Sequence, residues 1–221
     1  MSAVETAVPA PVDTAIPAPG LSRWRPGPAR LAKLLLGLGL FGVGESLLVA
    51  SKLGNSPWTV FAQGVARQTG MSVGAATIVT SVGVLCLWVP LRQRPGLGTI
   101  LNALLIGLAI DATLAVLPDH IPALVRVALI PSGIALVGVG SGLYLTSYLG
   151  PGPRDGLMTG LHKRTGVSLR LVRTAIELSA VTIGIVLGGT FGVGTVAFAA
   201  AIGPAVQAAV HRIGGTDTSR L

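Results

Sequence analysis

The chain has 221 residues, of which 51% are hydrophobic and only 11% are charged, with a net charge of +8. In soluble domains about a quarter of all residues are charged. The low charge content therefore excludes a water-soluble globular protein, and lipid is the expected solvent. The basic residues flank apolar segments and form no basic surface interleaved with aromatics, which excludes a nucleic-acid partner. The single cysteine, Cys86, excludes an intramolecular disulfide, and without a Cys/His cluster we expect no metal site.

The two ends of the chain differ from its middle. Residues 1–30 are rich in Ala and Pro and contain an eight-residue near-repeat, ETAVPAPV followed by DTAIPAPG. This composition predicts a disordered tail without a cleaved signal peptide. Residues 213–221 are polar and are expected to form a second tail. Two membrane regions lie between the tails, at 31–117 and 122–212.

Six apolar stretches predict an all-α membrane protein. Each has roughly 20 residues, the length that crosses about 30 Å of hydrocarbon as a helix. They cover 31–50, 72–91, 97–117, 122–146, 168–188 and 193–212. If the N-terminus is cytoplasmic, thirteen of the sixteen Lys and Arg residues face the cytoplasm. The positive-inside rule therefore predicts that both termini are cytoplasmic.

The chain also repeats itself at an offset of 96 residues. Leu53-Gly54 returns as Leu149-Gly150, and the stretch GLGT at 96–99 returns as GVGT at 192–195. Roughly 22 of the 75 residue pairs between 37–111 and 133–207 are identical. Each copy holds three spans, an odd number, so the second copy enters the membrane from the opposite face. This arrangement is an inverted 3+3 repeat, and such repeats place their working site at the seam.

A break and a short helix follow the first span of each copy. LGNSP breaks the first copy and GPGP the second, and Pro57 suits the first position of a new helix. The helix from 57 to 69 places Trp58, Phe61 and Val65 on one stripe. The pattern leaves two placements open, because the short helices can lie in the membrane interface or re-enter the membrane.

The second break has the residues expected of an anion site. Glycine and proline stop the incoming helix at 150–153, and the next helix starts with its N–H groups free beside Arg154. We therefore take Pro153, Arg154 and Asp155 as candidate substrate-binding residues, with Asn55 and Pro57 at the equivalent break. The alternative is that Asp155 only caps the helix and pairs with Arg154.

Three carboxyl groups within the apolar spans are candidates for proton coupling. A charge near the bilayer centre costs about 2.5–3.5 kcal/mol, so Glu45, Asp111 and Glu177 each need a partner or a wet cavity. Glu45 could equally be a single buried carboxyl bonded to a neighbouring helix, and Asp111 an interfacial carboxylate. Glu177 lies four residues after Arg173 and can pair with it on one helix face. Alternatively, Arg173 binds an anionic substrate and Glu177 holds it in place.

Five stretches carry a resemblance to a known family. They are LGNSPW, RPGLGTILNALLIGLAID, LGPGPRDGLM, RTGVSLRLVRTAIE and FGVGTV. With them the chain resembles the YczE/YyaS/YitT family of bacterial integral membrane proteins over about residues 34–207. The resemblance implies a small multi-span protein of the bacterial plasma membrane, and it implies no catalytic residues.

Two functions fit the sequence. The first is a secondary transporter or exporter of a small molecule, either anionic or amphipathic. The second is a non-transporting accessory or regulatory protein that supports a membrane-associated, biosynthetic assembly. No P-loop, HExxH or GxSxG motif is present, so we expect neither an enzyme nor a cofactor. The expected partners are the lipid bilayer and the small-molecule substrate, and a homodimer is left open.

Overall fold

The computed structural model describes residues 22–118 and 120–214, and these residues form eight α-helices without a strand. The predicted tails lie largely outside the described residues, although α1 already begins at Pro28 and α8 extends to Gly214. The helices are α1 (Pro28–Ser51), α2 (Pro57–Thr69), α3 (Val73–Leu91), α4 (Leu97–Val116), α5 (Ala123–Leu145), α6 (Pro153–Thr165), α7 (Leu169–Val186) and α8 (Val193–Gly214).

Five of these helices, α1, α3, α4, α5 and α8, are long and apolar enough to cross a membrane. Large apolar side chains cover their outward faces, with Leu124 84% and Val116 80% exposed, as expected of surfaces that contact lipid. Helix α7 coincides with the sixth predicted span, but its 18 residues include Arg170, Arg173 and Glu177 and it is not among the five. Five spans are therefore supported by length and composition.

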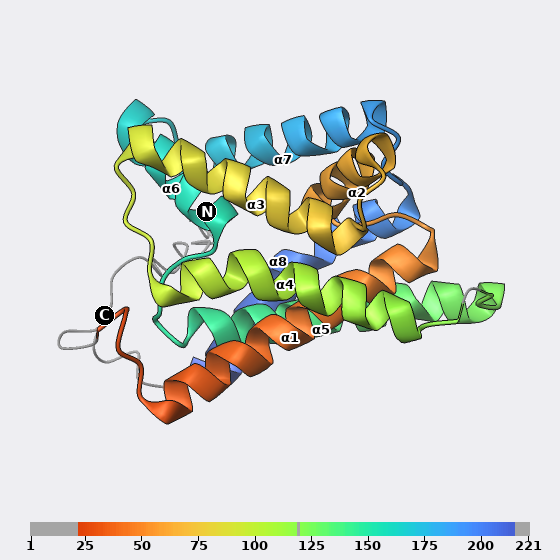
Figure 1. The fold of residues 1–221 in the computed structure, drawn as a ribbon, viewed down its shortest axis with the longest axis horizontal. Helices are drawn as coiled ribbons and strands as arrows, with labels where there is room; N and C mark the ends of the chain where they lie inside the picture. The colour runs from red at the N-terminus through yellow and green to blue at the C-terminus, as the bar shows by residue number, and fades with distance from the viewer. Residues whose placement is uncertain (1–21, 119, 215–221) are drawn as a thin grey trace, which may run out of the picture.

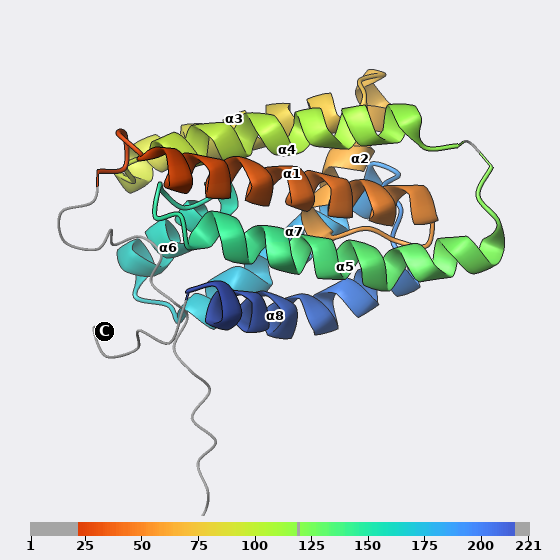
Figure 2. The same cartoon turned by 90° about the horizontal axis from the view of Figure 1, so that it is seen from below.

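The centre of the molecule is the antiparallel pair α1 and α5, which lie side by side in Figures 1 and 2. Glycines let their backbones approach closely. A Cβ atom at Gly37 would lie 2.8 Å from the carbonyl oxygen of Gly140, and one at Gly44 would lie 2.7 Å from that of Gly133. Small residues at a helix interface are the usual means of tight packing in membranes. Leucine, isoleucine and aromatic side chains from α1, α4, α5 and α8 fill the core around this pair.

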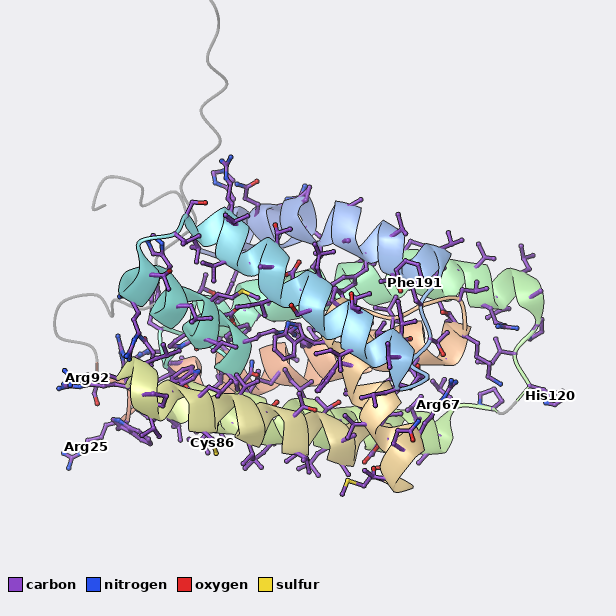
Figure 3. The ribbon with its side chains drawn as sticks, turned by 90° about the horizontal axis from the view of Figure 1, so that it is seen from above. Arg25, Arg67, Cys86, Arg92, His120 and Phe191 are labelled. Carbon is purple, nitrogen blue, oxygen red and sulfur yellow. The ribbon has the colours of Figure 1, made fainter. Side chains whose placement is uncertain are left out.

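Several contacts of the remaining helices recur in the two halves. Helix α4 packs on α1 and α8 on α5, whereas the short helix of each half packs on a helix of the other half, α2 on α7 and α6 on α3. Figure 3 shows that Arg25 and Arg92 lie at one end of the bundle, and Arg67 and His120 at the opposite end. The helix ends thus separate into two groups along the long axis.

Reciprocal hydrogen bonds hold the two chain breaks. The carbonyl oxygen of Leu149 accepts a bond from the N–H of Gly98 at 2.8 Å, and that of Leu53 accepts one from Gly194 at 2.9 Å. Gly54 and Gly150 have φ values of 122° and 121°, a conformation that side-chain-bearing residues rarely adopt. Each break is therefore fastened to the start of the last helix of the opposite half.

Candidate functional site

The two short helices begin inside the bundle and run towards opposite ends. Helix α2 lies along α7, with Gly64 against Gly184, and the Gln68 side-chain amide reaches the carbonyl oxygen of Leu187 at 3.0 Å. Helix α6 lies along α3, with Gly156 against Trp88. Proline occupies the first position of both short helices, as predicted for Pro57 and found again at Pro153. Both N-terminal ends, each carrying about half a positive charge, therefore point into the bundle.

Glu45 lies beside the start of α2. Its side chain is buried, and its Oε2 accepts hydrogen bonds from the hydroxyls of Ser56 and Thr59, both at 2.8 Å. Its other oxygen, Oε1, has no partner among the described residues. Glu45 stands six residues before the end of α1, about 9 Å along the helix axis. The chain thus turns back into the bundle before α2 begins.

Arg154 approaches the same region from α6. Its guanidinium lies over the ring of Phe41, 5.1 Å from the ring centre, in a cation–π arrangement. Phe41 is close to the midpoint of α1 and one helical turn from Glu45. Within the described part of the chain, Arg154 forms neither an ion pair nor a hydrogen bond. Its positive charge is therefore placed near the middle of the bundle without a fixed anionic partner.

Asp155 is held by a different residue from the one expected. Its carboxylate accepts a hydrogen bond from the hydroxyl of Tyr144, and Gly152, which precedes Pro153, caps α6 without a side-chain bond. The interpretation of Asp155 as a cap paired with Arg154 is not what the structure contains. The indole N–H of Trp88 donates to the carbonyl oxygen of Pro153 at 2.9 Å, which fixes the start of α6. Arg154 is thereby left available for other contacts.

Two cavities meet at Arg154. The smaller, of about 50 Å³, is lined by residues that include Glu45, Thr59, Pro153 and Thr77. The larger, of about 520 Å³, lies among α5, α6, α7 and α8, and its size is within the range of small-molecule sites. Both cavities share Phe41, Trp58, Asn102 and Arg154. The small polar cavity therefore adjoins the large cavity, which lies on the side of the second half.

The two halves differ at this point. In the first half, α3 packs along α4, and Asp111 joins them by accepting hydrogen bonds from Ser72 Oγ at 2.5 Å and from the N–H of Gly74 at 2.8 Å. In the second half, α7 makes almost no backbone contact with α8 within the described residues. The equivalent of Asp111 is Gln207, which lines the large cavity instead. We call the Asp111 contacts the α3–α4 clasp.

The other predicted residues fall into two groups. Arg173 and Glu177 form an ion pair at 2.9 Å and line the large cavity, and Pro57 also lines it. Asn55 is away from both cavities, since its amide donates to Gln63 at 2.9 Å and its backbone N–H donates to Thr190 at 3.3 Å. It secures the first break and is not placed to contact a ligand in either cavity.

Sequence reasoning missed several lining residues. The sequence pattern places Trp58 only on an apolar stripe and gives no site role to Phe41, Asn102 and Tyr144, although all four line a cavity. These residues sit in apolar runs where their neighbours give no sign of a cavity. A polar side chain inside an apolar run is a signal that could have found Asn102 and Tyr144.

Alanine substitution at two equivalent glycines tests the difference between the halves. A Cβ at Gly107 would lie 2.5 Å from the carbonyl oxygen of Gly74, whereas one at Gly203 meets no described atom within 4 Å. Gly107→Ala should lower the free energy of unfolding by about 1–3 kcal/mol through overpacking. Gly203→Ala should be neutral or stabilising by up to about 1 kcal/mol through helix propensity. Thermal unfolding in detergent measures both, and equal losses would contradict the asymmetry.

Comparison with known proteins shows which protein family this chain belongs to. The chain matches a family of unknown function (DUF6198) over residues 28–211. It is 42% identical to an uncharacterized protein of Haemophilus influenzae over 84% of this chain and 85% of that protein. It is 34% identical to the uncharacterized membrane protein YczE of Bacillus subtilis, over 72% and 75% of the two chains. The uncharacterized protein YyaS of the same organism is 27% identical over 72% and 82%.

No solved structure matches the chain. The family match runs from the first residue of α1 into the last turn of α8, so it includes both chain breaks and both cavities. The chain therefore belongs to the DUF6198 family, the family of YczE-type membrane proteins.

Proposed function

We propose that this protein is a secondary transporter or exporter of the bacterial cytoplasmic membrane. It moves a small molecule, anionic or amphipathic, past Arg154 and through the large cavity, and it is not an enzyme. Both termini face the cytoplasm. The observation that carries the proposal is the asymmetry between the halves, because one half is closed by a clasp where the other half holds an open cavity.

Helix α7 is the sixth span of this transporter. Its 18 residues extend about 27 Å, close to the thickness of the hydrocarbon layer. The charged residues Arg173 and Glu177 line the large cavity, while Leu171 and Leu178 on the same helix are exposed. Charged side chains in membrane spans usually face a cavity in this way. Charge content is then no obstacle to α7 crossing the membrane.

With six spans, the two halves are related as an inverted repeat. The reciprocal contacts at Leu53 and Leu149, 96 residues apart, support this relation. A second pair does so too, since Arg30 Nε donates to the carbonyl oxygen of Ser147 at 3.0 Å and Arg126 Nε to that of Ser51 at 2.6 Å. Residues 37–111 should superpose on 133–207 by a rotation near 180° about an axis in the membrane plane. The short helices are then re-entrant and meet near the midplane.

Transport follows if the two halves exchange their conformations. Inverted repeats alternate access to a central site by moving one part against another. In the second state α7 closes on α8, which brings Ser168 to Gln207 as Ser72 is now brought to Asp111. The α3–α4 clasp then opens on the opposite side of the membrane. Glu45, Asp111 and Glu177 remain the proposed carriers of a coupling proton, each from a position in a cavity or in the clasp.

An accessory protein would need no large cavity. A bundle that only supports an assembly can be solid, with every charged group paired. The cavity of about 520 Å³ and the unpaired guanidinium of Arg154 within the described residues favour transport over that alternative.

Topology is the first test of the proposal. Reporter fusions after Arg94 and after Lys163 should report the cytoplasm, and fusions near Arg67, His120 and Gly189 should report the outside. The physical reason is that basic loops are retained in the cytoplasm while the outer loops carry few bases. Finding the loops at 92–95 and 163–166 on opposite sides would rule out the inverted repeat.

The effect of Arg154 substitutions on small-molecule distribution is the second test. Extracts and media of cells with and without the gene are compared for all detectable small molecules, and at least one compound should change its distribution. Arg154→Ala should reproduce the deletion with the protein still inserted, and Arg154→Lys should restore only part, because an ammonium cannot replace a bidentate guanidinium. Arg94→Ala, at a loop outside both cavities, is the control. No change in any compound would favour the accessory function.

A further inference from the structure

Two buried polar atoms at the small cavity, one hydrogen-bond acceptor and one donor, have no hydrogen-bond partner among the described residues. Glu45 is 1% exposed, and its Oε1 accepts no hydrogen bond from any described residue. The indole Nε1 of Trp58 is likewise buried and donates to no described residue. Both residues line the cavity into which Arg154 extends. A buried polar atom without a partner costs about 1–3 kcal/mol, so each one needs an explanation, and a bound molecule is one that accounts for both atoms together.

The three groups divide into one acceptor and two donors. In its ionised form Glu45 can only accept hydrogen bonds, so Oε1 requires a donor, whereas Trp58 Nε1 and the Arg154 guanidinium require acceptors. The starts of α2 and α6 add positive potential around the cavity, α2 beside Glu45 and α6 beside Arg154. A simple anion would satisfy Arg154 and Trp58 but would leave Glu45 without a partner and facing a like charge. A simple cation would do the reverse.

The spacing fits a ligand that carries both charges close together. Phe41 and Glu45 are one turn apart on α1, with Cβ atoms about 5–6 Å from each other. Arg154 reaches in from α6 and stacks on Phe41, and both Arg154 and Glu45 line the small cavity. The cavity of about 50 Å³ has room for a small head group. The large cavity continues from it along Phe198, Ile202 and Val206 of α8, an apolar wall.

From this arrangement we infer that the site binds a small zwitterion with a primary or secondary ammonium and a carboxylate or phosphate group. The ammonium donates to Glu45 Oε1, the anionic group accepts from Arg154 and Trp58 Nε1, and an apolar substituent lies against α8. The inference rests on the proposed function, because it names the chemical class of the transported molecule. Glu45 thereby becomes the residue that separates zwitterions from plain anions.

Binding to the purified full-length protein in lipid nanodiscs tests this assignment. The probes are leucine and phenylalanine, their amides, which lack the carboxylate, and 4-methylpentanoate and 3-phenylpropanoate, which lack the amine. At least one of the two amino acids should bind at least about tenfold more tightly than its amide and its amine-free acid, as expected for one lost charged hydrogen bond. Equal affinity of the acid and the amino acid, or no binding of either amino acid at millimolar concentration, would overturn the assignment.

Two variants separate a ligand contact from a structural role. Glu45→Gln keeps the shape of the side chain and an oxygen for Ser56 and Thr59, and should reduce amino-acid affinity about tenfold to a hundredfold while leaving the amine-free acid unchanged. Trp58→Phe keeps an aromatic ring but removes the indole donor with part of the ring system, and should weaken binding of both the amino acid and the acid. Cys86→Ser, on the exposed face of α3, is the control. Unchanged selectivity in Glu45→Gln would contradict the role of Glu45.

Failure of this inference can be distinguished from failure of the proposed function. If the compound that accumulates in the deletion strain is an anion without an amine, transport stands and the zwitterion assignment falls. If no compound changes while amino acids still bind with the predicted selectivity, the site is a binding site without transport.

Discussion

Each half of the molecule holds the broken helix of the other half, and the site depends on that constraint. The bonds from Gly98 to Leu149 and from Gly194 to Leu53 fix both breaks inside an apolar bundle. Backbone polar groups at such depth must be satisfied by protein or face a cavity. Because the breaks are fixed, the short helices start at the interior and direct their positive ends, with Arg154, towards the midpoint of α1. The start of α6 thereby adds Arg154 to the polar groups that the long helices already contribute to both cavities.

Much of the fold could be predicted from the sequence because lipid imposes length and periodicity. The two short helices have the predicted start at Pro57 and end at Thr69 in the first copy, and Pro153 opens the second. The family was also confirmed by the comparisons. The sixth span was harder to establish, because α7 combines apolar residues with three charged ones, of which Arg173 and Glu177 line a cavity. Composition alone does not distinguish a charge that faces a cavity from one that lies at the membrane surface.

The site was only partly predictable for a related reason. Glu45 and Arg154 were conspicuous as charges in apolar surroundings, and both line the central cavities. The repeat suggested a similar role for Asn55. However, its side-chain amide donates a hydrogen bond to Gln63, and its backbone N–H donates one to the carbonyl oxygen of Thr190. The partner of Asp155 is Tyr144, which comes from a helix that the sequence gives no reason to pair with it. Which side chains meet across a chain break depends on how the helices pack, and the spacing of residues along the chain does not determine it.

Equivalent spin-label pairs in the two halves test the central claim, that one molecule holds two exchanging conformations. With Cys86 replaced by Ser, one pair is Leu178→Cys with Val196→Cys and the other, 96 residues earlier, is Val82→Cys with Ile100→Cys; all four positions are exposed. Distances are measured by pulsed electron resonance in lipid nanodiscs. Each pair should give a short and a long distance, and the fraction of long α7–α8 distances should match that of short α3–α4 distances. A single unvarying distance in each pair would contradict alternating access.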